Sequence, residues 1–209
     1  MLTAARLYAI VDLGYVVPAD IEVAALGLIA GGADLIQLRA KGHAEGEIEA
    51  FARRLLPLCR EAGVPLIVND FPEIAARVGA DGVHIGQDDG SLTAVRETVG
   101  PDRIVGRSTH SPDQARAALE EGFDYIGFGP LFPTPTKAGR PGIGLENVKD
   151  VQSRVGGKIP VFCIGGIRRD NLETVMAAGA KRVVIVSDLL TAPDIARATR
   201  EAVDKLGVA

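Results

Sequence analysis

Tryptophan is absent from this sequence of 209 residues, aromatic residues make up only 4% of it, and it has two cysteines. Neither Cys59 nor Cys163 has a second cysteine or a histidine at the spacing of a metal-binding motif, which argues against a structural zinc site. Each cysteine lies in an apolar segment. We therefore expect two buried free thiols, as is typical of a reducing compartment.

The sequence also lacks a cluster of basic residues and a long apolar run. Its formal net charge is −4, whereas a protein that binds nucleic acid irrespective of sequence needs clustered Lys and Arg. We find no charged-then-apolar leader, and no apolar run reaches the roughly 20 residues that cross a bilayer. We expect a cytoplasmic protein whose partners are small-molecule substrates rather than nucleic acid or a membrane.

The sequence does contain many short apolar segments rich in Val, Ile and Leu, each bounded by Gly, Pro or Asp. Such segments are typical of buried strands. We predict strands at Leu7–Asp12, Leu35–Arg39, Leu66–Asn69, Gly82–Ile85, Ile104–Arg107, Tyr125–Phe128, Val161–Ile164 and Val183–Val186. Amphipathic segments between them predict helices near 20–31, 46–62, 73–79, 92–99, 112–121, 145–155, 170–178 and 192–206.

The eight strand–helix units follow one another without a break in composition. Eight βα repeats predict an α/β fold of the (β/α)₈ TIM-barrel class, with residues 1–209 as a single domain. The hydrophobic content of 47% suits one large core. An open doubly wound sheet is the alternative, but it predicts a glycine-rich phosphate loop after the first strand. The segment Val11-Asp12-Leu13-Gly14 has no GxGxxG pattern.

In a barrel of this class, functional residues lie at the carboxyl ends of the strands, which meet at one mouth. Nearly every predicted strand ends there in glycine or in polar residues. They are Gln37, Arg39 and Lys41 (second strand), Asn69 and Asp70 (third), Gln87, Asp88 and Asp89 (fourth), Ser108, Thr109 and His110 (fifth), Gly165 and Gly166 (seventh) and Ser187 (eighth). We therefore expect the mouth to form a single site.

The segment after the sixth strand, residues 127–144, reads GFGPLFPTPTKAGRPGIG and is long for a connection in a compact domain. Proline limits its backbone freedom, and glycine allows close approach to a ligand. Thr134, Thr136 and Lys137 supply hydrogen-bond donors that suit an anionic oxygen. We interpret the segment as a semi-rigid flap that grips an anion, while a surface loop with a solvated lysine is the alternative.

Charged groups at the second to fourth strands suit a larger anion. Gln37, Arg39 and Lys41 alternate along the chain and therefore point the same way, which suits an anion beside a heteroaromatic ring. Asp70 and Asp89 come from neighbouring strands, and Mg²⁺ takes one or two carboxylates together with phosphate oxygens. A diphosphate bridged by Mg²⁺ is a coherent ligand. Ion pairs between these carboxylates and cations, without a metal, are the alternative.

The last two strands suggest a second anion site. Gly165-Gly166 and Ser187 follow them, where barrels often bind phosphate through backbone N–H groups, although a tight turn also explains the glycine pair. Among the histidines, His110 is a candidate general base, with a structural role favoured for a lone histidine. We expect His43 to be solvated in a loop and His84 to pack or hydrogen-bond in its strand.

Seven motifs together resemble the thiamine phosphate synthase family: IQLRAK (36–41), VND (68–70), ADGVHIGQDD (80–89), GRSTH (106–110), GPLFPTPTK (129–137), IGGI (164–167) and VVIVSDLL (183–190). Each motif is weak alone, but together they keep their order and spacing over nearly the whole chain. The resemblance implies a Mg²⁺-dependent barrel that couples 4-amino-2-methyl-5-hydroxymethylpyrimidine diphosphate with hydroxyethylthiazole phosphate. The products are thiamine phosphate and diphosphate, formed by a dissociative displacement.

The resemblance also implies roles for individual residues. Gln37 contacts the pyrimidine, Asp70 and Asp89 bind Mg²⁺, and Asp88 stands where the family often has Glu. The diphosphate is held by Arg39, Lys41, Asn69, Ser108 and Lys137, of which Arg39, Ser108 and Lys137 are catalytic, and the thiazole phosphate side is held by Thr134, Thr136, Gly166, Val186 and Ser187. These roles match the two anion sites expected at the mouth.

Two other functions fit the same barrel. Thiazole tautomerases tend to lose the metal carboxylates and the basic triplet and rely on a histidine placed like His110; Arg107 is a residue more associated with that branch. A non-catalytic sensor of phosphate ligands would need neither the aspartate pair nor Lys137, and all of these are present. The sequence leaves the oligomeric state undecided, so a homo-oligomer stays open.

Overall fold

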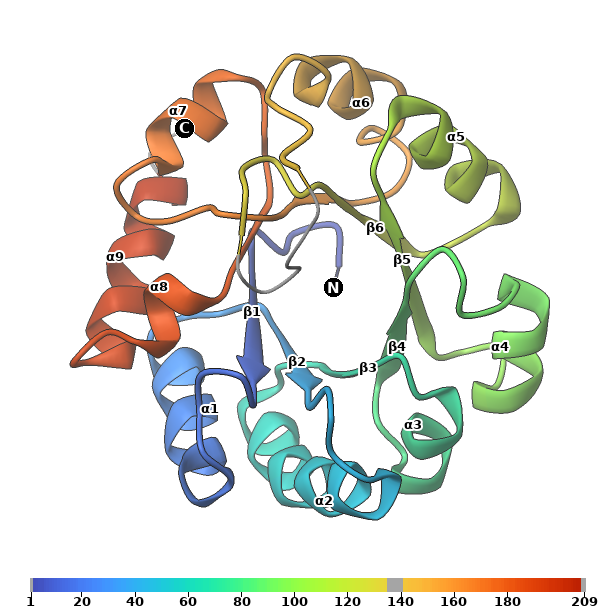
Figure 1. The fold of residues 1–209 in the computed structure, drawn as a ribbon, viewed down its shortest axis with the longest axis vertical. Coiled ribbons are helices and arrows are strands. Elements are labelled where there is room, and N and C mark those ends of the chain that lie inside the picture. Colours follow the sequence, from blue (N-terminus) through green and yellow to red (C-terminus); the bar gives the residue numbers. More distant parts are fainter. Residues whose placement is uncertain (1, 135–140, 208–209) are drawn as a thin grey trace.

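The computed structural model describes residues 2–134 and 141–207. Eight parallel strands follow one another around a closed barrel in the order of the sequence, and β8 pairs with β1 to close it. Figure 1 shows the helices arranged around these strands. The predicted (β/α)₈ barrel is therefore confirmed, and the open-sheet alternative is wrong.

All eight predicted strands form. They are β1 (Leu7–Asp12), β2 (Leu35–Arg39), β3 (Leu66–Asn69), β4 (Gly82–Ile85), β5 (Ile104–Thr109), β6 (Tyr125–Phe128), β7 (Val161–Cys163) and β8 (Val183–Ile185). β5 is longer than predicted because Ser108 and Thr109 still pair with β6. β7 ends before Ile164, and Gly165 turns the chain there with φ +98°.

The helices lie between the strands as predicted, with shifts of a few residues at their ends. They are α1 (Ile21–Ala30), preceded by a 3₁₀ turn η1 (Pro18–Asp20), α2 (Glu45–Ala62), α3 (Pro72–Val78), α4 (Leu92–Val99), α5 (Pro112–Glu121), α6 (Val148–Arg154), α7 (Leu172–Ala177), α8 (Ser187–Leu190) and α9 (Ile195–Gly207). The short helix α8 directly follows β8, so the last predicted helix is preceded by an additional turn of helix near the mouth.

The strands separate two apolar layers because successive side chains point to opposite faces. In β1, all six residues are buried. Leu7, Ala9 and Val11 belong to the core between strands and helices, whereas Tyr8 and Ile10 belong to the barrel interior. Burial on both faces explains why the strands are continuous apolar runs in the sequence rather than alternating ones.

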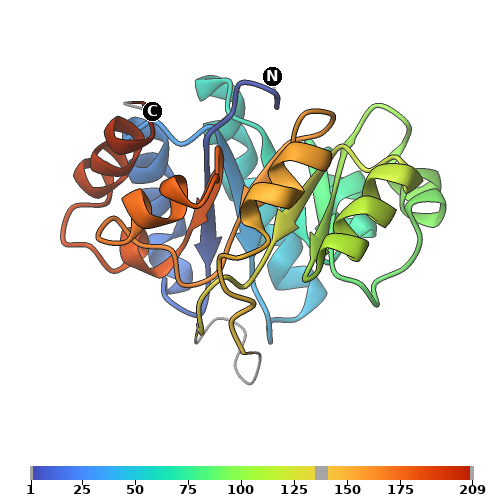
Figure 2. The same ribbon diagram turned by 90° about the horizontal axis from the view of Figure 1, so that it is seen from above.

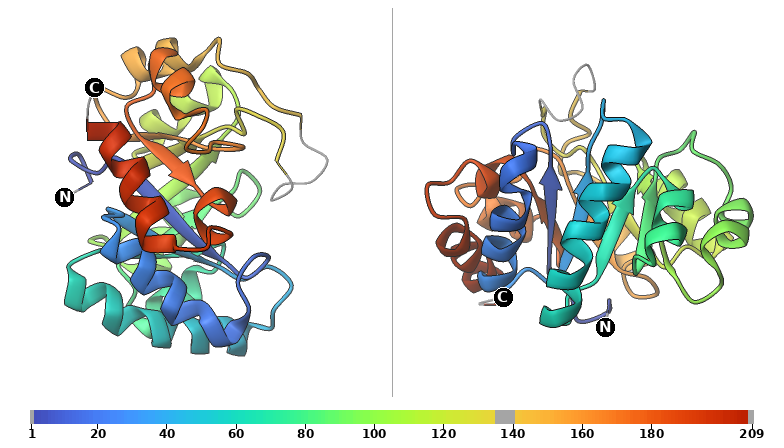
Figure 3. Two further views of the ribbon diagram at one scale, coloured as in Figure 1. Left: turned by 90° about the vertical axis from the view of Figure 1, so that its left-hand side faces the viewer. Right: turned by 90° about the horizontal axis from the view of Figure 1, so that it is seen from below.

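The strands place their carboxyl ends on the same side of the molecule. Figures 2 and 3 show the arrowheads pointing to one end, where the loops that lead into the helices gather. Because every strand contributes a loop to this end, residues far apart in the sequence meet there, as the polar strand ends predict.

A glycine makes room for one of the two tyrosine rings of the barrel interior. Gly106 on β5 lies opposite Tyr125, and a Cβ added at Gly106 would be 2.1 Å from Tyr125 Cζ. No carbon atoms approach so closely, so any side chain larger than hydrogen must displace the ring.

Gly106→Ala is therefore expected to lower the free energy of unfolding by about 1–3 kcal/mol, the usual cost of overpacking a core. Urea denaturation measures the change. Gly46→Ala is the control, because Gly46 lies in helix α2 with no atom within 4 Å of an added Cβ. There alanine should be neutral or stabilise by up to about 1 kcal/mol. A Gly106→Ala protein as stable as the parent would contradict the packing described.

Candidate active site at the barrel mouth

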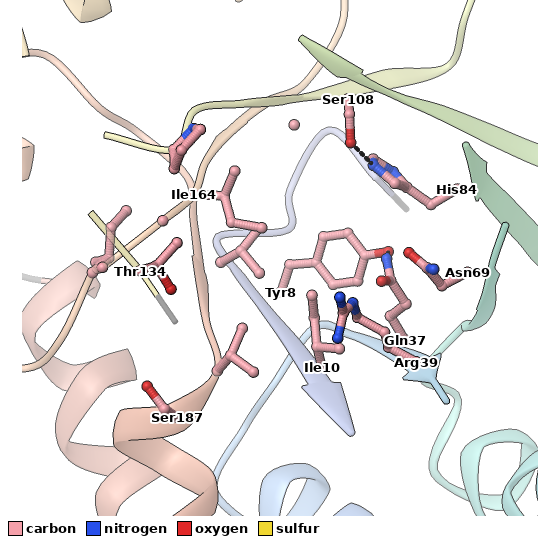
Figure 4. Close-up of a pocket in the computed structure, with 17 residues that line it drawn as sticks. Tyr8, Ile10, Gln37, Arg39, Asn69, His84, Ser108, Thr134, Ile164 and Ser187 are labelled. Atoms are coloured by element: carbon pink, nitrogen blue, oxygen red, sulfur yellow. Dashed lines mark hydrogen bonds between the residues drawn. The ribbon is translucent and has the colours of Figure 1, made fainter. Parts of the chain in front are cut away.

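A pocket of about 820 Å³, its open mouth included, lies at the carboxyl ends of the strands. We call the lining from β1 to β5 one half, formed by Tyr8, Ile10, Gln37, Arg39, Asn69, His84 and Ser108, and the lining from β6 to β8 with the segments that follow these strands the other half, formed by Gly127, Pro130, Thr134, Ile164, Gly165, Gly166, Ile167, Val184, Val186 and Ser187. Figure 4 shows these side chains around the common space.

The structure brings most of the predicted site residues into this one pocket. Gln37, Arg39, Asn69, Ser108, Thr134, Gly166, Val186 and Ser187 all line it. Thr136 and Lys137 lie outside the described residues. Lys41, Asp70 and Asp89 do not line the pocket itself, but Lys41 and Asp70 closely follow the pocket-lining residues Arg39 and Asn69.

Arg39 is held by an ion pair that only the tertiary structure reveals. Its Nη1 is 2.8 Å from Oδ2 of Asp12, and the two side chains are 12% and 2% exposed. The other Asp12 oxygen accepts a hydrogen bond from the Gly14 backbone N–H at 2.9 Å. Asp12 therefore fixes one side of the Arg39 guanidinium while Arg39 still lines the pocket.

A second ion pair joins Lys41 Nζ to Asp70 Oδ2 at 3.4 Å. Asp70 adopts φ +65°, a conformation uncommon outside glycine, and such residues gather at functional sites. Burial raises the pKa of Asp70, Lys41 opposes this shift, and the nearby charge of Asp89 adds to it. The carboxylates of Asp70 and Asp89 are therefore close enough to interact.

The donor chemistry here fits Mg²⁺ better than a transition metal. Mg²⁺ needs one or two carboxylates and takes its other ligands from water and phosphate, and Asp70 and Asp89 supply such a pair. Within residues 2–134 and 141–207, no group of three or more His, Cys, Asp and Glu side chains forms an all-protein metal cage. Asp89 is exposed at the rim, and its Oδ2 accepts a hydrogen bond from Gly86 N–H at 2.7 Å.

Below the mouth, polar side chains cross the barrel interior. Gln37 Nε2 donates to the Tyr8 hydroxyl at 2.5 Å, and the Tyr8 and Tyr125 hydroxyls lie 2.9 Å apart. His84 lies 3.0 Å from the Tyr125 hydroxyl through Nδ1 and 3.0 Å from the Ser108 hydroxyl through Nε2. Figure 4 marks the last of these bonds. The expected hydrogen-bonding role of His84 is confirmed.

The glycines after β7 shape the other half of the pocket. Gly165 and Gly166 both have positive φ, +98° and +65°. A Cβ at Gly165 would be 2.3 Å from Pro130 Cβ, and one at Gly166 would be 2.7 Å from Phe132 Cβ. The pair is therefore a tight turn that lets the segment after β6 pack closely and carry Thr134 to the pocket. The tight-turn explanation of these glycines is confirmed, and both glycines line the pocket. Binding of phosphate by their backbone stays a prediction.

Some candidate residues have structural roles instead. His110 Nδ1 lies 2.5 Å from the Gly129 carbonyl oxygen, and His110 does not line the pocket. Arg107 donates to the Gly90 and Gln87 carbonyl oxygens at 2.7 and 3.0 Å and lies 5.2 Å above the Phe123 ring. It points away from the pocket because Ser108, one position further along β5, points into it.

His43 differs from its prediction. It was expected to be solvated, but its ring packs edge-on against Phe51 at 5.3 Å, its side chain is 25% exposed, and Nδ1 lies 3.6 Å from Glu47 Oε2. The first two turns of α2, which carry Glu47 and Phe51, bring these side chains together with His43. The two cysteines are buried and free as predicted, and burial raises the pKa of Cys59 and Cys163 to about 12, so neither supplies a thiolate.

Sequence reasoning missed Tyr8, Asp12 and Tyr125 as parts of the site. Asp12 had an available signal, because it is a polar residue at the carboxyl end of β1. Tyr8 and Tyr125 had a weaker one, a phenol within an apolar strand, where its hydroxyl needs a partner when buried.

The fold and the residues at its mouth define a (β/α)₈-barrel protein with one enclosed cation, one exposed cation, two carboxylates and a glycine turn at the carboxyl ends of its strands. The family model of thiamine monophosphate synthase matches residues 7–189. The chain belongs to this family.

Individual relatives agree with the family model. The chain is 47% identical over 182 residues to a thiamine-phosphate synthase of Thermus thermophilus, covering 87% of each protein. It is also 47% identical over 187 residues to one of Geobacillus thermodenitrificans, covering 82% of each. A solved thiamine phosphate pyrophosphorylase of Pyrococcus furiosus superposes with a TM-score of 0.87 at 32% identity, over 98% of this chain and 96% of that one. Across the described residues, we find no helix whose length and apolarity would let it cross a membrane.

The Asp12–Arg39 pair yields a stability prediction. Asp12→Ala leaves the Arg39 charge without this partner at a site with only 12% exposure, so we expect the free energy of unfolding to fall by about 3 kcal/mol. Chemical denaturation measures this loss. Asp113→Ala removes an aspartate that is 85% exposed and paired with Arg116, and this control should show no measurable change. Equal stability of the two variants would refute a structural role for the buried pair.

Proposed function

We propose that this chain is a thiamine-phosphate synthase, which joins 4-amino-2-methyl-5-hydroxymethylpyrimidine diphosphate to hydroxyethylthiazole phosphate. The observation that carries the proposal is the convergence of two kinds of anion-binding groups on one pocket in a member of the thiamine monophosphate synthase family. In the reaction, the C–O bond to diphosphate breaks and its electron pair leaves with the diphosphate. The thiazole nitrogen then forms the new C–N bond to the pyrimidine methylene carbon.

The basic half of the pocket suits the diphosphate. Departure of the diphosphate concentrates negative charge on its oxygens, so cations placed in advance stabilise the transition state more than the substrate. Arg39 is held in place by Asp12, and Asn69 and Ser108 add hydrogen-bonding groups on the nearby strands β3 and β5. We assign the diphosphate to Arg39, Lys41, Asn69 and Ser108, with Lys137 from the segment after β6.

Asp70 and Asp89 would hold Mg²⁺. When bound, the ion would neutralise charge on the diphosphate oxygens. Asp70 favours such an ion for a physical reason: burial disfavours its charged form, and its cation partner Lys41 is 59% exposed and only loosely held. Lys41 is then available to contact the diphosphate while Asp70 contacts the metal.

The other half of the pocket suits the thiazole phosphate. Thr134 contributes a hydroxyl, and the turn at Gly166 and the Val186–Ser187 backbone line the space opposite Arg39. We assign the thiazole phosphate to Thr134, Thr136, Gly166, Val186 and Ser187. The pyrimidine then lies between the two halves, where Gln37 meets the ring.

The two alternative functions have less support. A tautomerase would rely on His110, but this side chain hydrogen-bonds to the Gly129 carbonyl and does not line the pocket. A sensor that does not catalyse would bind the phosphates without releasing diphosphate, an outcome that the coupling experiment separates from synthesis.

The direct experiment follows thiamine phosphate formation and diphosphate release from the two substrates, with Mg²⁺ and then with excess chelator. We expect turnover with Mg²⁺ and none with chelator. Asp70→Asn should lower kcat/KM by about 10²-fold, and added Mg²⁺ should no longer raise the melting temperature of this variant as it does that of the parent. Asp150→Asn, which changes an aspartate on the outer helix α6, is the control. Full turnover under chelator would disprove the metal assignment, and binding without turnover would favour the sensor.

Lys137 provides a separate test of charge stabilisation. Lys137→Ala should slow coupling by about 10²–10³-fold, as does the loss of one preorganised charge-stabilising donor in other enzymes. Single-turnover kinetics measures the change in the chemical step. Lys158→Ala, which removes an exposed lysine before β7, should leave the rate unchanged. A parental rate for Lys137→Ala would remove this lysine from the mechanism.

A further inference from the structure

Five side chains form one continuous hydrogen-bond network across the barrel, from β2 to β5. In order, they are Gln37, Tyr8, Tyr125, His84 and Ser108, joined by hydrogen bonds of 2.5, 2.9, 3.0 and 3.0 Å. All five residues are buried, with at most 9% exposure. Its two ends, Gln37 and Ser108, are two of the residues assigned to the substrate.

The chemistry of these five groups restricts which of them donates in each hydrogen bond of the network. The amide nitrogen of Gln37 can only donate, and it donates to the Tyr8 hydroxyl. Among the residues that the structure describes, the hydrogen bonds of the Tyr8 hydroxyl go to Gln37 and to Tyr125. Burial raises the pKa of both phenols, so each keeps its single proton. The Tyr8 hydroxyl therefore donates its hydrogen bond to the Tyr125 oxygen.

The same counting continues to the far end. Since the Tyr125 oxygen accepts from Tyr8, the Tyr125 hydroxyl donates to Nδ1 of His84. A neutral imidazole whose Nδ1 accepts a hydrogen bond carries its proton on Nε2, and Nε2 then donates to the Ser108 oxygen. Ser108 accepts this bond and keeps its hydroxyl proton for another partner.

We propose that the Gln37 amide sets the direction of all four hydrogen bonds, so that His84 is held as the Nε2–H tautomer and Ser108 presents its hydroxyl proton to the ligand. The proposal rests on the proposed function and extends it. It makes Tyr125 a positioning residue, since Tyr125 is fully buried and does not line the pocket.

The direction matters because of the charge of the ligand. An anionic diphosphate oxygen needs a donor, and the direction inferred here gives it the Ser108 O–H. In the opposite direction, the Ser108 hydroxyl would donate its hydrogen bond to His84 Nε2, and Ser108 would turn only lone pairs toward the anion. At the other end, Gln37 spends an N–H on Tyr8 and keeps its carbonyl oxygen as an acceptor for an N–H of the ligand. An aminopyrimidine diphosphate matches both ends.

The packing of the barrel interior holds the side chains of this hydrogen-bond network in place. The Tyr8, Tyr125 and Phe162 rings meet edge to face, with centroids 5.4–5.7 Å apart. One glycine leaves room for a ring: an added Cβ at Gly106 would be 2.1 Å from Tyr125 Cζ. Replacing a tyrosine of the network by phenylalanine, which removes the hydroxyl and keeps the ring, should thus disturb the hydrogen bonds and leave the packing intact.

The ¹⁵N NMR spectrum of the imidazoles tests the direction without any assay of activity. The protein has three histidines, and the spectrum of His84→Gln identifies the signals of His84 by their loss. We expect the parent protein to show a protonated Nε2 and an unprotonated Nδ1 at His84. A protonated Nδ1, alone or together with Nε2, would overturn the proposal.

Gln37→Glu tests whether Gln37 sets the direction. A carboxylate can only accept, so Tyr8 must donate to it, and every later bond reverses. We expect His84 to change to the Nδ1–H tautomer, although no atom of His84 or of its neighbours is altered. In the double variant Gln37→Glu with Tyr125→Phe, the link is cut and this change should disappear. An unchanged tautomer in Gln37→Glu alone would overturn the proposal.

Kinetics provides the functional readout. Tyr125→Phe should lower kcat/KM for the pyrimidine diphosphate about tenfold, which corresponds to about 1.4 kcal/mol, and leave KM for the thiazole phosphate unchanged. Thr199→Val, which removes a fully buried hydroxyl on α9 outside the barrel, is the matched control. Equal kinetics of Tyr125→Phe and the control would overturn the functional part. A parent protein that holds the expected tautomer but makes no thiamine phosphate would instead refute the proposed function.

Discussion

Alternation of side chains along eight closed parallel strands is the constraint on which the rest of this structure depends. Because a parallel barrel buries both faces of each strand, a shift of one position moves a side chain from the pocket to the helix layer. On β5, Ser108 points into the pocket while Arg107 ties the Gln87–Gly90 loop from outside. Polar groups on the inner face must then find partners inside the barrel, which is why Tyr8, Tyr125 and His84 bond to one another.

The cations of the mouth are paired before any ligand arrives, and the two pairs differ in rigidity. Arg39 and Asp12 are almost enclosed, with a short contact, so this pair fixes an orientation. Lys41 and Asp70 are more exposed and further apart, at 3.4 Å. A weak, solvated pair can exchange partners at little cost, so Lys41 and Asp70 can both turn to other partners. The mouth therefore combines one fixed charge with one that can adapt.

Much of the fold and part of the site could be predicted from the sequence. Apolar runs bounded by glycine or proline are patterns of a few consecutive residues. The ends of all eight strands therefore lie within two residues of the predicted ones. The pocket residues at strand ends, such as Gln37, Asn69 and Ser187, followed from topology alone. The partner of Arg39 did not, because Asp12 is 27 positions away in the sequence and pairing across strands leaves no local pattern.

By itself, the sequence determined the barrel, the order of its strands and the kinds of chemical groups at its mouth, because propensity and periodicity act over a few residues. Only the tertiary structure decided which groups meet. It turned His43 against Phe51, gave His110 a backbone partner outside the pocket, and joined Tyr8 to Tyr125 across 117 positions. Closure of the barrel brings distant strands together. The direction of each hydrogen bond in the interior network depends on all five of its side chains, and no single segment of the sequence contains them all.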